Sequence, residues 1–165
     1  MKTKRHDYIN WDDYFMAIAQ LSAKRSKDPS TQVGSCIVNN KKRIIGMGYN
    51  GFPVGCSDDL LPWDREGDFL DTKYPFVCHA EMNAITNSSN KMQLEGASIY
   101  TSLFPCNECA KLIVQVGIKE VVFLSDKYAN TDVFIAARRI FDMANVKLRQ
   151  LITETKEITI QLNND

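Results

Sequence analysis

The sequence predicts an α/β fold, in which a β-sheet with parallel members carries helices on its faces. Two observations support this prediction. From about residue 79 onward, segments with helical spacing of apolar residues alternate with short strand-like segments, and a strand pair precedes them. The chain also has 165 residues, of which 44% are hydrophobic and 24% are charged. This size and composition suit a single domain over residues 1–165 with a well-filled core.

The first part of the chain predicts one helix and a β-hairpin. Apolar side chains recur at helical spacing from Trp11 onward, so we expect a helix to begin there. It should end within residues 24–27, because Asp28 precedes a proline and is disfavoured in helical torsions. The expected strands of the hairpin cover residues 33–38 and 43–49.

The segment 51–76 predicts an ordered insertion. It shows neither a helical nor a strand period, and its glycines and prolines favour loop structure. It also carries many large apolar side chains, which a disordered linker lacks. Structureless connections of this length are uncommon in compact domains and are often functional.

The remaining sequence predicts the alternation of helices and strands on which the fold class rests. The expected helices cover residues 79–88, 106–116 and 131–144, and the expected strands cover residues 97–101, 120–124 and 146–151. The tail over residues 157–162 alternates apolar and polar side chains, so we expect that it can add an edge strand.

Composition and charge exclude several classes of protein. Lys and Arg number 20, as do Asp and Glu, so the formal net charge is zero, which argues against a nucleic-acid partner. The chain has no apolar run of the roughly 18 residues that a membrane helix needs, and its start leads into no signal-like stretch. We therefore expect a soluble, cytoplasmic protein with a small-molecule ligand and no membrane partner. The five cysteines are an odd number and do not suit a disulfide framework.

Four residues carry the strongest chemical signal: His79, Glu81, Cys106 and Cys109. A catalytic zinc ion takes three protein ligands from His, Cys or carboxylates and keeps a fourth position for water. His79, Cys106 and Cys109 supply such a set, and both sulfurs lie at the start of an expected helix. Unpaired amide hydrogens and the helix dipole favour thiolates at that position. We therefore expect a catalytic Zn²⁺ whose water loses a proton near neutral pH.

Glu81 is expected to be the catalytic proton carrier. On a helix it projects about 200° around from His79, so it need not bind the same metal. A lone Cys-x-x-Cys is more often half of a structural zinc site or a redox pair, but Cys36, Cys56 and Cys78 show no spacing that completes such a site. The combination of His-x-Glu with Pro-Cys-x-x-Cys is typical of zinc nucleobase deaminases, in which the glutamate is a general acid and base.

Further stretches make the sequence resemble the deoxycytidylate (dCMP) deaminases of the zinc-dependent cytidine deaminase superfamily, over nearly the whole chain. The zinc motif alone indicates the superfamily, and the other stretches indicate the member. These stretches are residues 14–29, from YFM at 14–16 through RSKDP at 25–29, then QVG at 32–34, GYNG at 48–51, GCSDD at 55–59, LPW at 61–63, DTKYP at 71–75, CHAE at 78–81, FPCNECAK at 104–111 and SDKY at 125–128.

The resemblance implies a three-layer α/β/α sandwich around a five-stranded mixed sheet. It also implies zinc on His79, Cys106 and Cys109, and hydrolysis of dCMP to dUMP and ammonia, a reaction that feeds dTTP synthesis. Such enzymes from eukaryotes and phages are typically homo-hexamers, activated by dCTP and inhibited by dTTP together with Mg²⁺. We expect the same assembly and the same effectors here.

Phosphate recognition distinguishes a monophosphate enzyme from a nucleoside enzyme, because a dianion needs charge-assisted donors. Arg25, Ser26 and Lys27 can supply these donors. On the sequence alone, Arg25 and Lys27 also fit a solvated helix end with cations that favour the dipole. The further contacts that the resemblance implies are Asn50 at the sugar hydroxyl, Phe104 beside the base and Tyr128 near the nucleotide.

The segment 51–76 has six acidic residues against two basic ones, Arg65 and Lys73. Carboxylates beside a phosphate site suggest a hard cation such as Mg²⁺ that bridges the two. We expect the effector site at this segment together with the loop 48–51. The apolar side chains of the same segment fit a subunit interface as an alternative.

Two other functions stay open at this point. One is another zinc nucleobase deaminase, acting on tRNA adenosine or on free cytidine, which would need a cationic surface or would lack a phosphate site. The other is a zinc-stabilised binding module without turnover. Glu81 separates this last alternative from an enzyme, because a structural zinc site has no use for a carboxylate beside an open position.

Overall fold

The computed structural model describes residues 2–163 and contains a five-stranded mixed sheet in the order β2-β1-β3-β4-β5. β1 is antiparallel to β2 and to β3, whereas β3, β4 and β5 are mutually parallel. The strands are β1 (Gly34–Val38), β2 (Ile44–Tyr49), β3 (Ser98–Leu103), β4 (Glu120–Ser125) and β5 (Lys147–Gln150). The helices are α1 (Trp11–Ala23), α2 (Ala80–Thr86), α3 (Asn107–Gln115) and α4 (Asp132–Met143), with short 3-10 turns η1 (Phe69–Asp71) and η2 (Lys91–Gln93).

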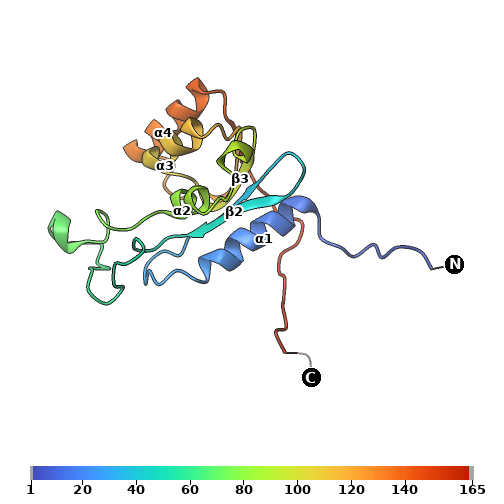
Figure 1. Ribbon diagram of the computed structural model, residues 1–165, viewed down its shortest axis with the longest axis horizontal. Helices are drawn as coiled ribbons and strands as arrows, with labels where there is room; N and C mark the ends of the chain where they lie inside the picture. Colours follow the sequence, from blue (N-terminus) through green and yellow to red (C-terminus); the bar gives the residue numbers. More distant parts are fainter. Residues whose placement is uncertain (1, 164–165) are drawn as a thin grey trace.

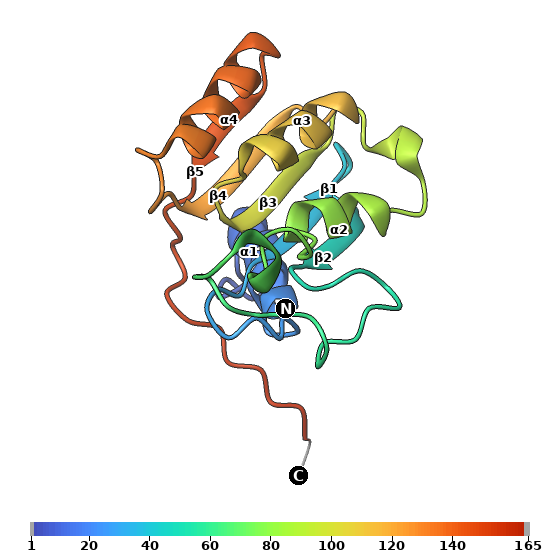
Figure 2. The same ribbon diagram turned by 90° about the vertical axis from the view of Figure 1, so that its left-hand side faces the viewer.

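The helices cover both faces of the sheet. α1 lies against one face, and α2, α3 and α4 lie on the other (Figures 1 and 2). The predicted three-layer α/β/α sandwich with a five-stranded mixed sheet is therefore confirmed. Parallel pairing of β3 with β4 and of β4 with β5 follows from the helical crossovers α3 and α4, which return the chain to the same end of the sheet.

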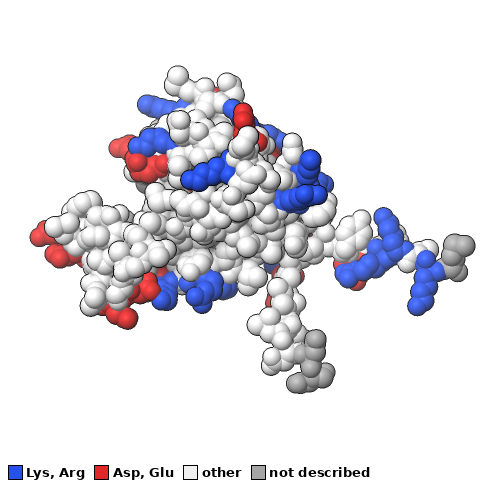
Figure 3. All heavy atoms as spheres, in the orientation of Figure 1, with Lys and Arg blue, Asp and Glu red and all other residues white. Residues whose placement is uncertain are grey.

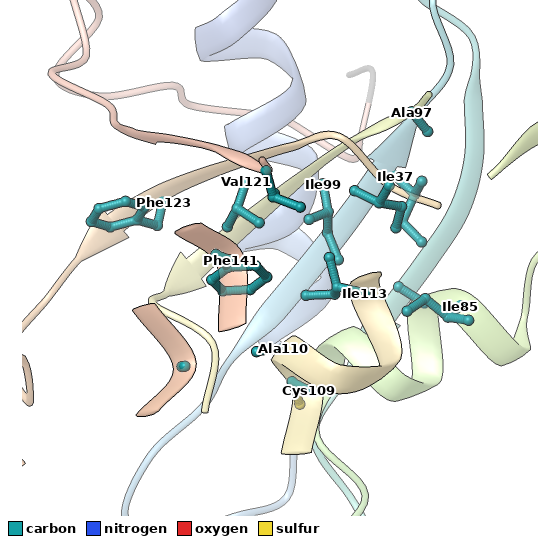
Figure 4. Close-up of a cluster of buried hydrophobic side chains, with 14 of the residues drawn as sticks. Ile37, Ile85, Ala97, Ile99, Cys109, Ala110, Ile113, Val121, Phe123 and Phe141 are labelled. Atoms are coloured by element: carbon teal, nitrogen blue, oxygen red, sulfur yellow. The ribbon is translucent and has the colours of Figure 1, made fainter. Parts of the chain in front are cut away.

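Alternation along the strands divides the core in two, because successive side chains of a strand point to opposite faces. Strand residues of the larger core, under α2, α3 and α4, are Ile37, Ile99, Val121 and Phe123 (Figure 4). Strand residues that pack against Phe15 and Met16 of α1 are Cys36, Val38, Tyr100 and Val122. The central strands are thus buried on both faces, which explains why they read as continuous apolar runs.

Two glycines allow helices to approach the sheet closely. A β-carbon on Gly34 would lie 1.8 Å from the backbone oxygen of Ala19, in α1. A β-carbon on Gly48 would lie 2.3 Å from the backbone nitrogen of Ala84, in α2. Neither position has room for a side chain, so these glycines set the distance of α1 and α2 from the sheet.

The element boundaries mostly agree with the sequence predictions to within two residues, the usual uncertainty of helix and strand ends. One prediction is wrong: residues 157–162 form no strand. The described residues beyond β5 first contact the start of α1, where the Thr155 N–H donates to Asp13 Oδ2 at 2.7 Å, and then leave the body of the protein as an extended arm (Figures 1 and 2). An alternating pattern becomes a strand only where a neighbouring strand supplies hydrogen bonds, and this arm has none within the described chain.

The segment 51–76 consists mainly of turns and bends around η1. The rings of Phe52 and Trp63 pack with centroids 4.1 Å apart, and Trp63 Nε1 donates to the Asp58 carbonyl at 2.9 Å. On the face shown in Figure 3, acidic side chains gather at the end of the molecule that this segment forms. Among residues 2–163, no helix has both the length and the apolar character that crossing a membrane requires.

Candidate active site

The predicted metal ligands come together where two helices begin. His79 occupies the N-cap position of α2 and Cys106 that of α3, and Cys109 lies in the first turn of α3. His79 Nδ1 lies 3.3 Å from the sulfur of Cys106 and 3.5 Å from that of Cys109. The backbone N–H of Cys109 donates to the Cys106 sulfur at 3.5 Å, which fixes the first turn of α3.

The donor set fits a zinc ion. One imidazole nitrogen and two sulfurs lie within 4.8 Å of one another, and zinc prefers this combination of ligands. A hydrogen bond from Cys109 and the proximity of His79 lower the pKa of Cys106, so one sulfur is prepared as a thiolate. The hydrogen bond with Cys106 in turn raises the pKa of His79 to about 9. A metal ion on the imidazole nitrogen would compete with a proton for the same lone pair.

Glu81 lies beside this cluster and is buried, with 4% of its surface exposed. The hydroxyl of Thr101 donates to its Oε1 at 3.2 Å, and its Oε2 lies 3.5 Å from the sulfur of Cys109. Burial raises the pKa of Glu81, since the charged form loses its hydration. The carboxyl group is thus poised to accept and hold a proton.

A cavity of about 380 Å³ opens onto the cluster and is large enough for a nucleotide-sized ligand. His79, Glu81 and Cys106 line one part of it. The other lining side chains, polar and apolar, are Asp28, Thr31, Val33, Asn50, Arg65, Lys73, Tyr74, Val77, Ala80, Leu103, Phe104, Tyr128, Thr131, Val133 and Phe134. The cavity therefore combines titratable groups with apolar walls, as expected of an active site.

A buried ion pair shapes the cavity wall. Lys73 pairs with Asp28, and their side chains are only 8% and 1% exposed. Asp28 also accepts from Nδ2 of Asn50 at 3.2 Å and from the backbone N–H groups of Ser30 and Thr31. This network joins the loop after α1 to the loop before α2, so it holds the two sides of the cavity together.

Three of the predicted substrate contacts line the cavity: Asn50, Phe104 and Tyr128. Asn50 is held by the protein, since its Oδ1 accepts from the Val33 N–H at 2.8 Å and its Nδ2 donates to Asp28 and to the Thr31 carbonyl. Phe104 is buried, and the guanidinium of Arg138 lies 4.2 Å from the centre of its ring.

The other three predicted contacts are absent from the cavity lining. Arg25 is exposed, and Lys27 is exposed and pairs with Asp58. The hydroxyl of Ser26 donates to the Asn50 carbonyl at 2.9 Å, so it supports a neighbouring loop. Their assignment to the phosphate stays a prediction.

Sequence reasoning missed the roles of three residues. Arg65 and Lys73 line the cavity, although the sequence marked them only as the basic minority of an acidic segment. Thr101 contacts Glu81 from the middle of β3, where a threonine is ordinary and gives no signal. The DTKYP stretch around Lys73 was the one available clue, as part of the family resemblance.

The remaining cysteines stand apart from the metal-ligand set. None of the five cysteines forms a disulfide. Cys36 is fully buried in the core, and burial raises its pKa to about 12, which makes it unreactive.

Comparisons with known proteins agree with this geometry. The cytidine and deoxycytidylate deaminase zinc-binding region matches residues 9–125. Human deoxycytidylate deaminase is 58% identical over 162 residues, which cover 98% of this chain and 90% of the human protein. The probable deoxycytidylate deaminase of Drosophila melanogaster is 54% identical over 166 residues, with coverages of 97% and 81%.

Solved structures point the same way. The dCMP deaminase of cyanophage S-TIM5, crystallised in complex with dCMP and dUMP, matches with a TM-score of 0.69 and 27% identity. The match covers 88% of this chain and 100% of the phage chain. The fold, the His/Cys/Cys cluster with its buried glutamate, and these relatives together establish that the chain is an enzyme that belongs to the cytidine and deoxycytidylate deaminase family.

Proposed function

We propose that this enzyme hydrolyses dCMP to dUMP and ammonia, with a zinc ion held by His79, Cys106 and Cys109. The observation that carries the proposal is the buried carboxylate of Glu81, which contacts the ligand cluster and lines the cavity. A purely structural metal site needs no such group. The substrate is supported by the relatives, which include deoxycytidylate deaminases at 58% identity and a phage enzyme bound to dCMP and dUMP.

The chemistry divides between the metal and the chain. When bound, zinc lowers the pKa of a coordinated water enough to make it a nucleophile near neutral pH. Glu81 accepts the proton that the water loses and passes it to the ring nitrogen next to carbon 4. It then helps to protonate the amino group, which leaves as ammonia when the C4–N bond breaks after the C4–O bond has formed. The raised pKa of Glu81 suits a group that must hold this proton between two transfers.

The cavity walls orient the nucleotide. Phe104 and Phe134 provide apolar surface beside the base and exclude water from the reacting atoms. Asn50 is the proposed contact to the sugar hydroxyl. Its Oδ1 accepts one hydrogen bond from Val33 and keeps a second lone pair for a ligand hydroxyl.

Two sets of residues are candidate partners of the phosphate. Arg65 and Tyr128 line the cavity, and a guanidinium and a phenol are suitable donors to a phosphate dianion. Arg25 and Lys27, with Ser26, are the donors that the sequence predicts.

The variants R65Q and K27Q separate these candidates. The variant that removes the true contact should raise KM for dCMP about tenfold or more, and leave deoxycytidine turnover unchanged. An equal loss on both substrates would mean that the residue supports the fold rather than the phosphate.

The resemblance to the family also suggests that nucleotides regulate this enzyme. We propose dCTP as activator and dTTP as inhibitor, each with Mg²⁺, acting on a cytoplasmic homo-hexamer that feeds dTTP synthesis. The acidic segment 51–76 with the loop 48–51 is the proposed effector site. Its support is the excess of carboxylates there, which suits a bound Mg²⁺.

Ammonia release tests the function directly. Zinc-loaded protein is given dCMP, deoxycytidine, CMP and dCTP in parallel, with and without dCTP as an added effector. We expect turnover confined to dCMP and increased by dCTP. Equal activity on deoxycytidine would remove the requirement for a phosphate, and turnover of none of the four would refute the proposed reaction.

A further inference from the structure

A chain of buried hydroxyl groups lies behind Glu81. Ser35 on β1 and Thr101 on β3 are paired residues in the sheet register, and both are fully buried. Ser35 Oγ donates to Thr101 Oγ1 at 3.2 Å, and Thr101 Oγ1 donates to Glu81 Oε1 at 3.2 Å. The chain runs from the middle of the sheet to the carboxylate.

The two carboxylate oxygens of Glu81 therefore have different surroundings. Oε1 faces Thr101, whereas Oε2 lies 3.5 Å from the sulfur of Cys109. A glutamate side chain has three rotatable bonds before its carboxylate, and its terminal torsion is broad. The hydrogen bond to Oε1 restricts that last rotation and leaves Oε2 on the side of the metal ligands.

Thr101 also has a second acceptor within reach. Its Oγ1 lies 3.0 Å from the carbonyl oxygen of Leu103, in the same strand. A threonine hydroxyl has one proton and two lone pairs, and Ser35 occupies one lone pair. Its single proton therefore lies between two acceptors, Glu81 Oε1 and the Leu103 carbonyl, and this holds the hydroxyl between β3 and the Glu81 carboxylate.

The location of Thr101 connects the parts of the site. Glu81 belongs to α2, and Thr101 belongs to β3, whose last residue Leu103 precedes the cysteines of α3 by only a short connection. One hydrogen bond therefore ties the proton carrier to the strand that leads into Cys106 and Cys109. A shift of this strand relative to α2 would move Glu81 away from the metal.

We propose that Thr101 is a positioning residue, whose hydroxyl fixes the carboxylate plane of Glu81 so that Oε2 faces the metal ligands and the substrate. The proposal rests on the proposed deaminase function. Ser35 on β1 holds the Thr101 hydroxyl by a hydrogen bond and does not itself contact Glu81.

The test compares T101V, T101S and a control on the same strand. Valine keeps the shape of threonine and lacks the hydroxyl, whereas serine keeps the hydroxyl. Ser98 is the matched control, because it lies on β3 and its hydroxyl donates to another carboxylate, Glu120, at 2.9 Å. Each variant is measured for kcat and KM with dCMP, for zinc content, for affinity toward the product dUMP and for thermal unfolding.

We expect T101V to lower kcat about 10- to 100-fold, the loss typical of a misplaced catalytic group, with little change in KM. Its zinc content and dUMP affinity should match those of the unmodified chain. T101S should recover most of kcat, and S98A should retain all of it. The kcat of S35A should lie between that of T101V and that of the unmodified chain.

Three results would overturn the assignment. These are a T101V enzyme with unchanged kcat, a T101S enzyme as slow as T101V, or a T101V enzyme that loses zinc or dUMP binding along with activity. If T101V unfolds too readily to be measured, the T101S and S35A enzymes decide the question. An unchanged kcat in S35A together with a lowered kcat in T101S would contradict the proposed chain of hydroxyl groups. Failure of the unmodified enzyme to turn over dCMP refutes the proposed function instead, whatever the variants do.

Discussion

The ion pair of Lys73 with Asp28 is the most consequential interaction at the scale of single residues. A buried charge without a partner is costly. Replacing either residue of the pair should therefore lower the free energy of unfolding by much more than the loss of an exposed ion pair would. Asn50 and two backbone N–H groups share the Asp28 carboxylate, which stays fully satisfied only while all of them are in place. Two loops of the cavity depend on this one carboxylate.

K73M should therefore lower the free energy of unfolding by about 3 kcal/mol, because it leaves the Asp28 carboxylate buried without its cation. Denaturant unfolding measures this loss. The matched control is K27M, which removes an exposed pair with Asp58 and should have no measurable effect. The double variant D28N/K73M should recover part of the stability, and no recovery would show that Lys73 acts through packing alone.

At the scale of secondary-structure elements, the packing of α2 on β2 decides where the catalytic groups lie. His79 and Glu81 lie at the start of α2. Asn83 of this helix and the C-cap residue Asn87 donate to the Tyr49 and Met47 carbonyls at 2.7 and 3.0 Å. These side chains cover the outer edge of β2 and fix the helix along the strand. Gly48 fixes its distance from the sheet.

G48A should displace α2, because the added β-carbon would lie 2.3 Å from the Ala84 nitrogen and 2.4 Å from the Ala80 carbonyl. We expect a loss of about 1 to 3 kcal/mol in the free energy of unfolding. We also expect kcat for dCMP to fall by more than the fraction of enzyme that is unfolded can explain. The control is G51A, where the nearest atom to the new β-carbon is a Tyr49 ring carbon at 3.9 Å. A G48A enzyme with normal kcat would show that the position of α2 is not critical.

A second contact between elements is sensitive to acid. Asp12, at the start of α1, accepts hydrogen bonds from Arg149 of β5 at 2.6 and 3.1 Å and from the Tyr100 hydroxyl of β3 at 2.7 Å. The bonds from Arg149 lower the pKa of Asp12 below its ordinary value, although partial burial opposes them. A lowered folded-state pKa adds stability above the unfolded-state pKa, near 3.9, and that stability is lost as pH falls through the folded value.

D12N should therefore be less stable than the unmodified chain at pH 6, and this difference should shrink as the pH falls below about 4. Unfolding free energies between pH 3 and 6 measure the effect. A difference that stays constant over this range would mean that the charge of Asp12 contributes nothing and that only its hydrogen bonds to Arg149 and Tyr100 matter.

At the scale of the whole molecule, the sheet with its helices was predictable from sequence because local patterns decide it. The periodicity of apolar residues located the strands and helices, because each element is buried against other elements of the same chain and this burial imposes the apolar pattern. The zinc-ligand cluster was predictable for a similar reason, because His79 and the Cys106 motif each begin a helix. Their meeting needed only that α2 and α3 lie side by side.

The parts that escaped prediction depend on contacts between segments far apart in the chain. The tail over 157–162 has a strand pattern, but no strand of the described residues 2–163 pairs with it, and its own residues cannot reveal this. The cavity lining is similar. Lys73 is 45 residues from Asp28 in sequence, and Thr101 is 20 residues from Glu81. Their residue types are ordinary for their positions, so only the fold shows that they surround the site.

The most direct test of the central claim is a measurement on E81Q, which keeps the shape of the side chain and removes its capacity to carry a proton. Ammonia release from dCMP and zinc content are determined on the same preparation. We expect activity to fall by about 10²- to 10⁴-fold, the usual contribution of a general acid and base, while one zinc ion per chain remains bound. Retained activity, or loss of the zinc along with the activity, would contradict the assignment of Glu81 as the proton carrier beside the metal.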